Sequence, residues 1–338
     1  MMPGFLAFNN ERKFYRQIMQ NSILAVDIGG TNTKLALVNP DGDTGQVISI
    51  PTSNEKGVDN FLSEIIISAK SLLDENGNGT VSGVGIGVAG FVDPDHTKMT
   101  FNPNIKWLEG VLLKDYFSEN LNLPVGLEID SNAAALAEAV HGGGKNSRRL
   151  LVISVGTGVG GGMIIDGDIL RISNECLGDI GHVIVEPGGM QCAVGCRGCA
   201  EAMVSASALE RYAAEYMAED KNSIGYNVLK NGEENKTPEI ISAARNGDSA
   251  AEKAIQKLGK YLGIALASIV PVLAPDQISI AGGISEAGLI FFNATQSSFL
   301  EIAGTSYARG VRIQKSVFGW QSVLVGAAAA QRRESNLI

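Results

Sequence analysis

Two short glycine-rich segments constrain the fold of this chain more than any other feature. One is Asp27-Ile28-Gly29-Gly30-Thr31-Asn32, and the other is Gly156-Thr157-Gly158-Val159-Gly160-Gly161-Gly162. Both lie between runs rich in β-branched and apolar residues, a pattern that predicts hairpins. Because glycine lets backbone N–H groups approach an anion closely, two such turns predict two halves of the chain that bind a polyphosphate between them. The flanking runs are residues 23–27, 33–38, 150–155 and 163–165.

The composition favours a folded protein that does not bind nucleic acid. The chain has 338 residues, which is long enough for two domains, and 45% of them are apolar against 19% charged. A net charge of −9 argues against a nucleic-acid partner, which needs a basic face. No Walker A sequence occurs, and two GxGxxG spacings, at residues 85–90 and 156–161, lack the following helix of a dinucleotide site. The phosphate cradle is therefore of another kind.

The cysteines and the apolar runs indicate the compartment. Three of the four cysteines lie within residues 192–199, which is typical of a metal site in a reducing compartment. Residues 1–20 lack the apolar stretch of a signal peptide, and the longest apolar run, 261–274, is too short to cross a bilayer. We expect a cytoplasmic protein with no membrane partner.

Hydrophobic periodicity predicts alternating strands and helices, and so an α/β fold. Apart from the two hairpins, buried strands are predicted at residues 81–88 and 277–281, and another ends at Asp130. Helices are predicted at residues 58–74, 131–140, 200–218, 249–273 and 321–333.

Taken in order, the motifs of this chain resemble those of the ROK family of sugar kinases and repressors, members of the actin-like ATPase superfamily. The two glycine segments resemble the family's two phosphate loops, and residues 128–135 (EIDSNAAA) resemble its catalytic segment. Residues 178–182 (GDIGH), followed by residues 192–201, resemble the family signature, and Ile278–Ser285 resembles the turn on the adenosine side. The ordered set, from about Ser22 to the C-terminus, is highly specific.

This resemblance implies two α/β domains, each built on a ribonuclease-H-like sheet, with the active site in the cleft between them. The expected small N-terminal domain takes residues 22–133 and is completed by the C-terminal residues 321–338. The expected large domain takes residues 134–320. Many family members are homodimers, so a homodimer is expected here.

Asp130 is the residue expected to act as the catalytic base. A carboxylate at the start of a helix is favoured as an anion, and phosphoryl transfer uses a carboxylate to accept the proton of the attacking hydroxyl. Aspartate is also a common helix N-cap, which is the purely structural alternative. Asp27 resembles the acid that holds Mg²⁺ through water. Lys34 is expected to be an exposed strand lysine.

The resemblance also implies where the nucleotide and the sugar bind. Asp130, Asp179, His182 and Glu201 match positions that contact the sugar, and Asn104 lies where the family often places an asparagine near it. Trp107 is expected in the core. The expected nucleotide-binding residues are Asp27, Gly29, Gly30, Thr31, Asn32, Gly156, Thr157, Gly158, Gly282 and Gly283.

The family signature further implies a zinc site, with one departure. His182, Cys192 and Cys199 match three ligand positions, but Val194 stands where the middle cysteine belongs, and Cys196 follows two residues later. Three cysteines and one histidine suffice for a tetrahedral site. The alternative is a metal-free loop held by packing. Cys176 matches no ligand position and is expected to be a buried thiol.

The expected activity is ATP- and Mg²⁺-dependent phosphorylation of a hexose hydroxyl, from glucose to glucose 6-phosphate. Ile129 replaces the family's asparagine before the catalytic aspartate, and Asp179 replaces its glutamate, so both departures bear on the sugar. If Ile129 packs against an acetyl group, an N-acetylhexosamine kinase, for N-acetylmannosamine or N-acetylglucosamine, is the alternative. A sugar-responsive regulator is disfavoured because only 21 residues precede Ser22, where the resemblance begins, too few for the N-terminal helix-turn-helix of the family's regulators. Polyphosphate in place of ATP stays open.

Overall fold

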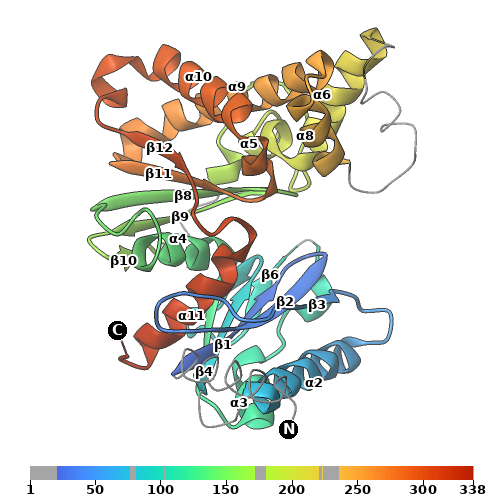
Figure 1. The fold of residues 1–338 in the computed structure, drawn as a ribbon, viewed down its shortest axis with the longest axis vertical. Coiled ribbons are helices and arrows are strands. Elements are labelled where there is room, and N and C mark those ends of the chain that lie inside the picture. Colours follow the sequence, from blue (N-terminus) through green and yellow to red (C-terminus); the bar gives the residue numbers. More distant parts are fainter. Residues whose placement is uncertain are drawn as a thin grey trace, which may run out of the picture. The chain divides into compact units, whose positions relative to one another are not determined.

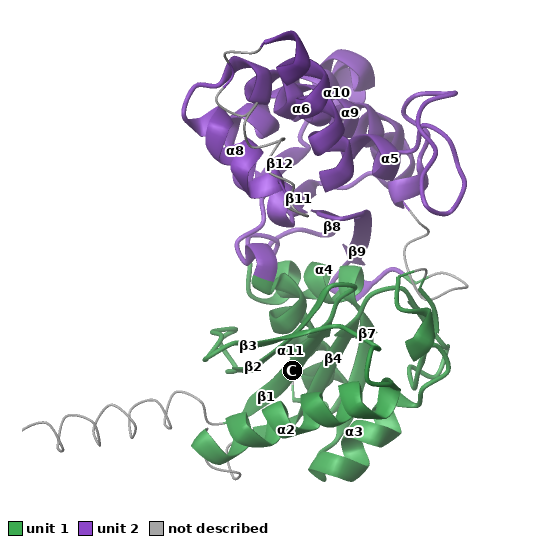
Figure 2. Ribbon diagram, turned by 90° about the vertical axis from the view of Figure 1, so that its right-hand side faces the viewer, with its two compact units in different colours: residues 1–142, 171–176, 321–338 green, residues 143–170, 177–320 purple. Residues whose placement is uncertain are grey.

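The computed structural model describes residues 21–76, 81–102, 104–171, 180–220, 223 and 236–337. The chain forms two compact units (Figure 2). The first comprises Met1–Gly142, Arg171–Cys176 and Gln321–Ile338, and the second comprises Gly143–Leu170 and Leu177–Trp320. Each unit contains a five-stranded sheet flanked by helices, which confirms the α/β class. Helix α4, which begins at Asp130, lies in the first unit; the domain division expected from the sequence stays a prediction.

The first unit is built on a mixed sheet in the order β3-β2-β1-β4-β7. Strands β1, β2 and β3 pair antiparallel, whereas β4 lies parallel to both β1 and β7. The carboxyl ends of β1, β4 and β7 therefore meet at one edge of the sheet, where ligands bind in open α/β sheets. The strands are β1 (Ser22–Ile28), β2 (Asn32–Val38), β3 (Ile48–Pro51), β4 (Val81–Val88), β7 (Val125–Ile129) and the separate pair β5 (Phe91–Val92) and β6 (Met99–Phe101).

Helices cover both faces of this sheet because successive side chains of β4 point to opposite faces. Val84, Ile86 and Val88 join the core formed with helix α2, while the alternate glycines face α11. At Gly85 a Cβ would lie 2.1 Å from the backbone oxygen of Ala327, so only glycine lets α11 come this close. The helices are α2 (Val58–Asn76), α3 (Leu113–Leu121), α4 (Asp130–Val140), α11 (Ser322–Glu334) and the 3-10 turn η2 (Lys106–Leu108).

The second unit repeats the same strand topology in the order β10-β9-β8-β11-β12. Strands β8, β9 and β10 pair antiparallel, and β11 lies parallel to β8 and β12. The strands are β8 (Arg149–Val155), β9 (Val159–Ile165), β10 (Asp168–Ile169), β11 (Gln277–Ala281) and β12 (Arg312–Lys315). Its helices are α5 (Ala200–Val204), α6 (Ala206–Glu219), α8 (Thr237–Arg245), α9 (Ser249–Leu273) and α10 (Leu289–Ala308), with 3-10 turns η3 (Ile180–His182), η4 (Gly283–Ala287) and η5 (Gly319–Gln321), the last of which ends in the first unit.

The helices of the second unit pack together on one side of its sheet (Figure 1). The long helices α9 and α10 approach closely at Gly263, where a Cβ would lie 2.5 Å from the backbone oxygen of Thr295. The predicted helix 249–273 is confirmed as α9, but the predicted helix 200–218 is wrong as a single element. It breaks into α5 and α6 at Ser205, whose ψ of 171° is extended.

None of the helices in the described ranges combines the length and the apolar character needed to cross a membrane.

Candidate functional site

The first glycine turn joins β1 to β2 and faces solvent. The paired residues Ile28 and Thr33 close the hairpin, and the Gly29 N–H donates to the backbone oxygen of Asn32 at 3.2 Å. Gly30, Thr31 and Asn32 are exposed. The turn thus offers backbone N–H groups and a hydroxyl to a ligand, as its sequence predicts.

Asp27 stands just before this turn, near the carboxyl end of β1, and is 8% exposed. Its carboxylate lies 3.9 Å from the ammonium group of Lys34 on the paired strand. Desolvation raises the pKa of Asp27 to about 7; Lys34 opposes this shift, and the charge of Asp130 adds to it. The expectation of an exposed Lys34 is wrong, because the residue is half-buried and paired.

Asp130 is the first residue of α4 and follows β7 directly. It is not the N-cap, which is Ile129, so the capping alternative does not apply. The carboxylate of Asp130 accepts the backbone N–H of Ser131 at 2.6 Å. Desolvation nevertheless raises its pKa to about 6, the direction opposite to that expected from its place in the helix. The carboxylate therefore remains mostly ionised at neutral pH, with a pKa near that of a useful base.

Asp27 and Asp130 lie at the same edge of the first sheet. Strand β4 separates β1 from β7, with Gly87 paired with both Asp27 and Glu128. The charge of Asp130 raises the pKa of Asp27, and a divalent cation beside the two carboxylates would relieve this repulsion. Oxygen ligands of this kind suit Mg²⁺, so the residues fit the expected ion.

A buried network beside Asp130 was not found from the sequence. Glu128 is 3% exposed, and its carboxylate accepts the side-chain amide of Asn132 at 3.1 Å and the backbone N–H of Ile129 at 2.9 Å. Arg171 pairs with the same carboxylate, with Nη2 at 2.5 Å from Oε2. The hydrogen bond between Glu128 and Asn132 joins the end of β7 to the first turn of α4. The one sequence signal was an acidic residue within an otherwise apolar strand.

Two further residues of the first unit bear on the sugar. Asn104 lies beside the first glycine turn, since a Cβ on Gly30 would be 3.6 Å from the Asn104 Cβ. Ile129 is 2% exposed and belongs to the hydrophobic core with Leu127 and Val88. This position in the core gives no support to the alternative in which Ile129 packs against an acetyl group of the sugar. Trp107 is half-buried, with its ring edge-on to Phe61 at 5.0 Å, at the border of the core.

The second glycine turn joins β8 to β9 in the second unit. The pair Val155 and Val159 closes the hairpin, and the Gly156 N–H donates to the oxygen of Gly158 at 3.0 Å. Thr157 at its tip is exposed. Gly282, with φ of +88°, lies against β8, since a Cβ there would be 2.3 Å from the Val155 oxygen. The expected adenosine-side turn, Gly282 and Gly283, thus lies beside this phosphate loop.

Glu201, in the first turn of α5, also reaches this loop. Its Oε2 accepts the backbone N–H of Val159 at 3.3 Å. Asp179, the other acidic residue expected to contact the sugar in this unit, lies outside the described residues, as does Cys176.

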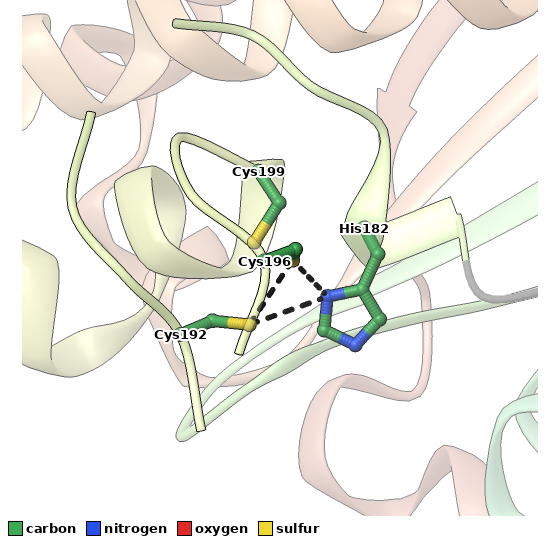
Figure 3. A group of neighbouring side chains, drawn as sticks. All are labelled: His182, Cys192, Cys196 and Cys199. Carbon is green, nitrogen blue, oxygen red and sulfur yellow. Dashed lines mark hydrogen bonds between the residues drawn. The ribbon is translucent and has the colours of Figure 1, made fainter. Parts of the chain in front are cut away.

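A histidine and three cysteines converge in the second unit (Figure 3). The ligand atoms of His182, Cys192, Cys196 and Cys199 all lie within 4.8 Å of one another. The His182 Nδ1 is 3.7 Å from the Cys192 sulfur and 3.3 Å from the Cys196 sulfur. In a tetrahedral zinc site with Zn–S bonds of about 2.3 Å, neighbouring ligand atoms are separated by roughly 3.8 Å. The four residues therefore fit zinc, and Cys196 takes the place left by Val194, which is 50% exposed.

The protonation of these thiols is also consistent with a metal site. Burial, reinforced by hydrogen bonds with Cys192 and Cys199, raises the pKa of Cys196 to about 12. Three thiols packed this closely cannot all ionise without a cation beside them. A metal ion that binds here has to displace thiol protons, so its affinity rises with pH.

Comparison with known proteins agrees with this arrangement. The ROK family model matches residues 23–334. A glucokinase from Halalkalibacterium halodurans is 32% identical over 317 residues, covering 93% of this chain and 96% of that protein. A ROK family glucokinase from Streptomyces griseus, solved with glucose and AMPPNP, superposes with a TM-score of 0.80 at 30% identity and covers 92% of this chain and 99% of that one.

The same fold also occurs in a regulator. A ROK family transcriptional regulator, a homologue of the E. coli MLC protein, superposes with a TM-score of 0.79 at 25% identity, covering 92% of this chain and 78% of that one. Fold alone thus does not separate kinases from regulators, whereas the glucokinase relatives match over nearly their full length. The chain belongs to the ROK family, as one of its sugar kinases of the actin-like ATPase type.

Proposed function

We propose that the protein transfers the γ-phosphate of ATP to a hexose hydroxyl, with glucose as substrate and glucose 6-phosphate as product. The observation that carries this proposal is Asp130: a half-buried carboxylate at the start of α4, with its pKa raised to about 6, close to Asp27 at the same sheet edge. The glucokinase from Halalkalibacterium halodurans and the glucose and AMPPNP bound to the Streptomyces griseus enzyme support the choice of substrates.

In the proposed reaction, the Asp130 carboxylate accepts the proton of the sugar O6 hydroxyl. The sugar oxygen then forms a bond to the γ-phosphorus, the bond from that phosphorus to the β-phosphate oxygen breaks, and ADP leaves. Asp27 would hold Mg²⁺ through water, and the ion would supply charge neutralisation for the phosphates. The turns at Gly29–Asn32 and Gly156–Gly158 contribute backbone N–H groups and the hydroxyls of Thr31 and Thr157 to nucleotide binding.

The proposed sugar contacts are the positions that match those of the family: Asn104, Asp130, Asp179, His182 and Glu201. The ring of His182 directs Nδ1 at the cysteines and its other nitrogen away from them (Figure 3), so one ring can serve a zinc ion and a sugar hydroxyl. His182, Cys192, Cys196 and Cys199 would hold zinc in a structural role, in which the ion would fix the loop that carries Cys192 and Cys196. A homodimer stays a prediction.

A coupled assay of ADP release tests this function directly. Glucose, mannose, N-acetylglucosamine and N-acetylmannosamine are compared with ATP and Mg²⁺, and polyphosphate is offered in place of ATP. We expect glucose to give the highest kcat/KM. Since Ile129 lies in the core, nothing in the described residues now favours an acetylated sugar. If none of these sugars led to ADP release, the proposal would be contradicted.

A further inference from the structure

The second phosphate loop makes hydrogen bonds with α5 and α6, the two helices that follow the His/Cys cluster in the sequence. The Ala206 N–H, at the start of α6, donates to the Gly156 oxygen at 2.8 Å. Glu201, at the start of α5, accepts the Val159 N–H at 3.3 Å. One contact therefore holds each end of the turn. The first is made by the backbone alone, whereas the second depends on a single side chain.

The approach of Glu201 to the loop is close. A Cβ added to Gly158 would lie 2.6 Å from the Glu201 Oε2, so the carboxylate packs directly against the glycine backbone. Glycine at position 158 leaves the room that this carboxylate fills. The Glu201 carboxylate therefore contacts the loop in two ways, through the hydrogen bond to Val159 and through packing against Gly158.

Val159 is also contacted by the segment that carries His182. A Cβ on Gly181 would lie 2.0 Å from the Val159 oxygen, so the 3-10 turn η3 presses on the first residue of β9. Gly181 precedes His182, and Glu201 follows Cys199 by two residues. Both segments that touch Val159 are therefore anchored at residues of the His/Cys cluster.

We propose that Glu201 is a positioning residue for the nucleotide: by holding the Val159 N–H it fixes the phosphate loop, and so sets ATP affinity even when no sugar is bound. The inference rests on the proposed function, in which this loop binds the nucleotide. A carboxylate has two oxygens, so holding the loop through Oε2 is compatible with a sugar hydroxyl at Oε1. The single residue then links the sugar site to the nucleotide site.

Nucleotide binding without sugar tests this role, because a residue that only contacts sugar cannot affect it. The Kd of AMPPNP with Mg²⁺ is measured by calorimetry for the wild type, Glu201→Ala and Glu201→Gln. We expect Glu201→Ala to bind about five- to tenfold more weakly, since the N–H of a loop residue loses its charged acceptor. Glu201→Gln is the matched control: its amide oxygen still accepts the N–H, so its Kd stays within about twofold.

Glu201→Gln also distinguishes two effects of Glu201 on nucleotide affinity. It removes the negative charge near the phosphates but keeps an oxygen that accepts the Val159 N–H. Wild-type affinity in Glu201→Ala would overturn the inference, and so would equal losses in both variants. Should Glu201→Ala fail to fold, Glu201→Asp replaces it: one methylene shorter, it cannot reach Val159, and we expect about a threefold loss. Unchanged affinity in that variant would overturn the inference equally. A wild-type chain that binds no AMPPNP would contradict the proposed function as well.

Discussion

The two sheets of this protein have one topology but carry different chemistry. In each, an antiparallel hairpin with a glycine turn is followed by two parallel strands on its far side. In the first unit an acid, Asp27, stands one residue before the end of the first hairpin strand, and Asp130 follows the last parallel strand. The corresponding places in the second unit are Ser154 and Ser316.

This difference shows how a repeated scaffold divides the work of one reaction. The first unit concentrates ionisable oxygen at its sheet edge, which suits proton transfer and a divalent cation. The second unit has serines at the two corresponding positions and instead carries Glu201, which contacts its glycine turn, and a His/Cys cluster. The fold supplies the positions, and the residue types there decide the role of each half.

The largest difference between the two units is expected at the residues that follow the last parallel strands, Asp130 after β7 and Ser316 after β12. Asp130→Asn keeps the shape of the side chain but cannot accept a proton, so we expect kcat to fall by about 10²- to 10⁴-fold while sugar binding persists. The matched control is Ser316→Ala in the second unit, a 4% exposed residue whose backbone N–H to Ile280 is unaffected. Steady-state kinetics of both variants measure the contrast. Similar kcat values in the two would show that the acid is not the base.

The pH profile of the wild type sharpens the same point. A base must be deprotonated to act, and desolvation raises the pKa of Asp130 to about 6 from an ordinary 3.8. We therefore expect kcat to be constant above about pH 7 and to fall about tenfold per pH unit well below 6. A rate that holds down to pH 4.5 would contradict a raised pKa.

The next largest effect is expected at Ile129, where the family asparagine is replaced. Because Ile129 is 2% exposed within the core, Ile129→Asn buries an amide and removes packing, and should lower the free energy of unfolding by about 2–4 kcal/mol. Ile129→Val is the control and should cost about 0.5–1.5 kcal/mol. Denaturant unfolding measures both. A stable Ile129→Asn protein with higher kcat/KM for glucose would mean that this side chain does reach the sugar.

Ile129 also shows where sequence reasoning stopped short. Strand alternation was available: Val125, Leu127 and Ile129 share one face of β7, and Gly126 and Glu128 share the other. Reading that period would have placed Ile129 in the core. The family resemblance concerns only the residue type at this position and does not indicate which face of β7 carries it.

Other elements were predictable because their signals are local. Both hairpins are confirmed, since glycine turns between apolar runs specify them, and α9 follows from a long unbroken period. The break at Ser205 was missed because the residues around it keep a helical pattern. The pairing of Glu128 with Arg171 joins residues 43 apart in sequence, and no spacing rule reaches that far. Cys196 was predicted as a replacement ligand, and the structure brings it to His182.

The residues before the two glycine turns, Asp27 and Ser154, differ in the same way, with a smaller expected effect. Asp27→Asn should raise the Mg²⁺ concentration for half-maximal activity about 10- to 100-fold, since residues that hold a metal through water contribute about that much. Ser154→Ala, at the corresponding place in β8, should change it less than twofold. Titrating Mg²⁺ at saturating ATP and sugar measures both. If both variants raised the Mg²⁺ concentration for half-maximal activity equally, both turns would contribute to binding the ion. The proposed difference between the two units would then be wrong.

The smallest effect is expected from the cluster that only the second unit carries among the described residues. Protein purified without chelator should contain about one zinc per chain by elemental analysis, because four ligand atoms lie within 4.8 Å of one another. Cys196→Ser should lose that zinc, since the hydroxyl is a poor ligand, and loosen the loop that precedes Glu201. We expect the KM for sugar to rise several-fold with kcat little changed.

Cys176→Ser, a position outside the ligand set, should keep its zinc and its KM. Zinc retained in Cys196→Ser would show that Cys196 is not the replacement ligand, and metal-free wild type with ordinary activity would show that packing alone holds the loop.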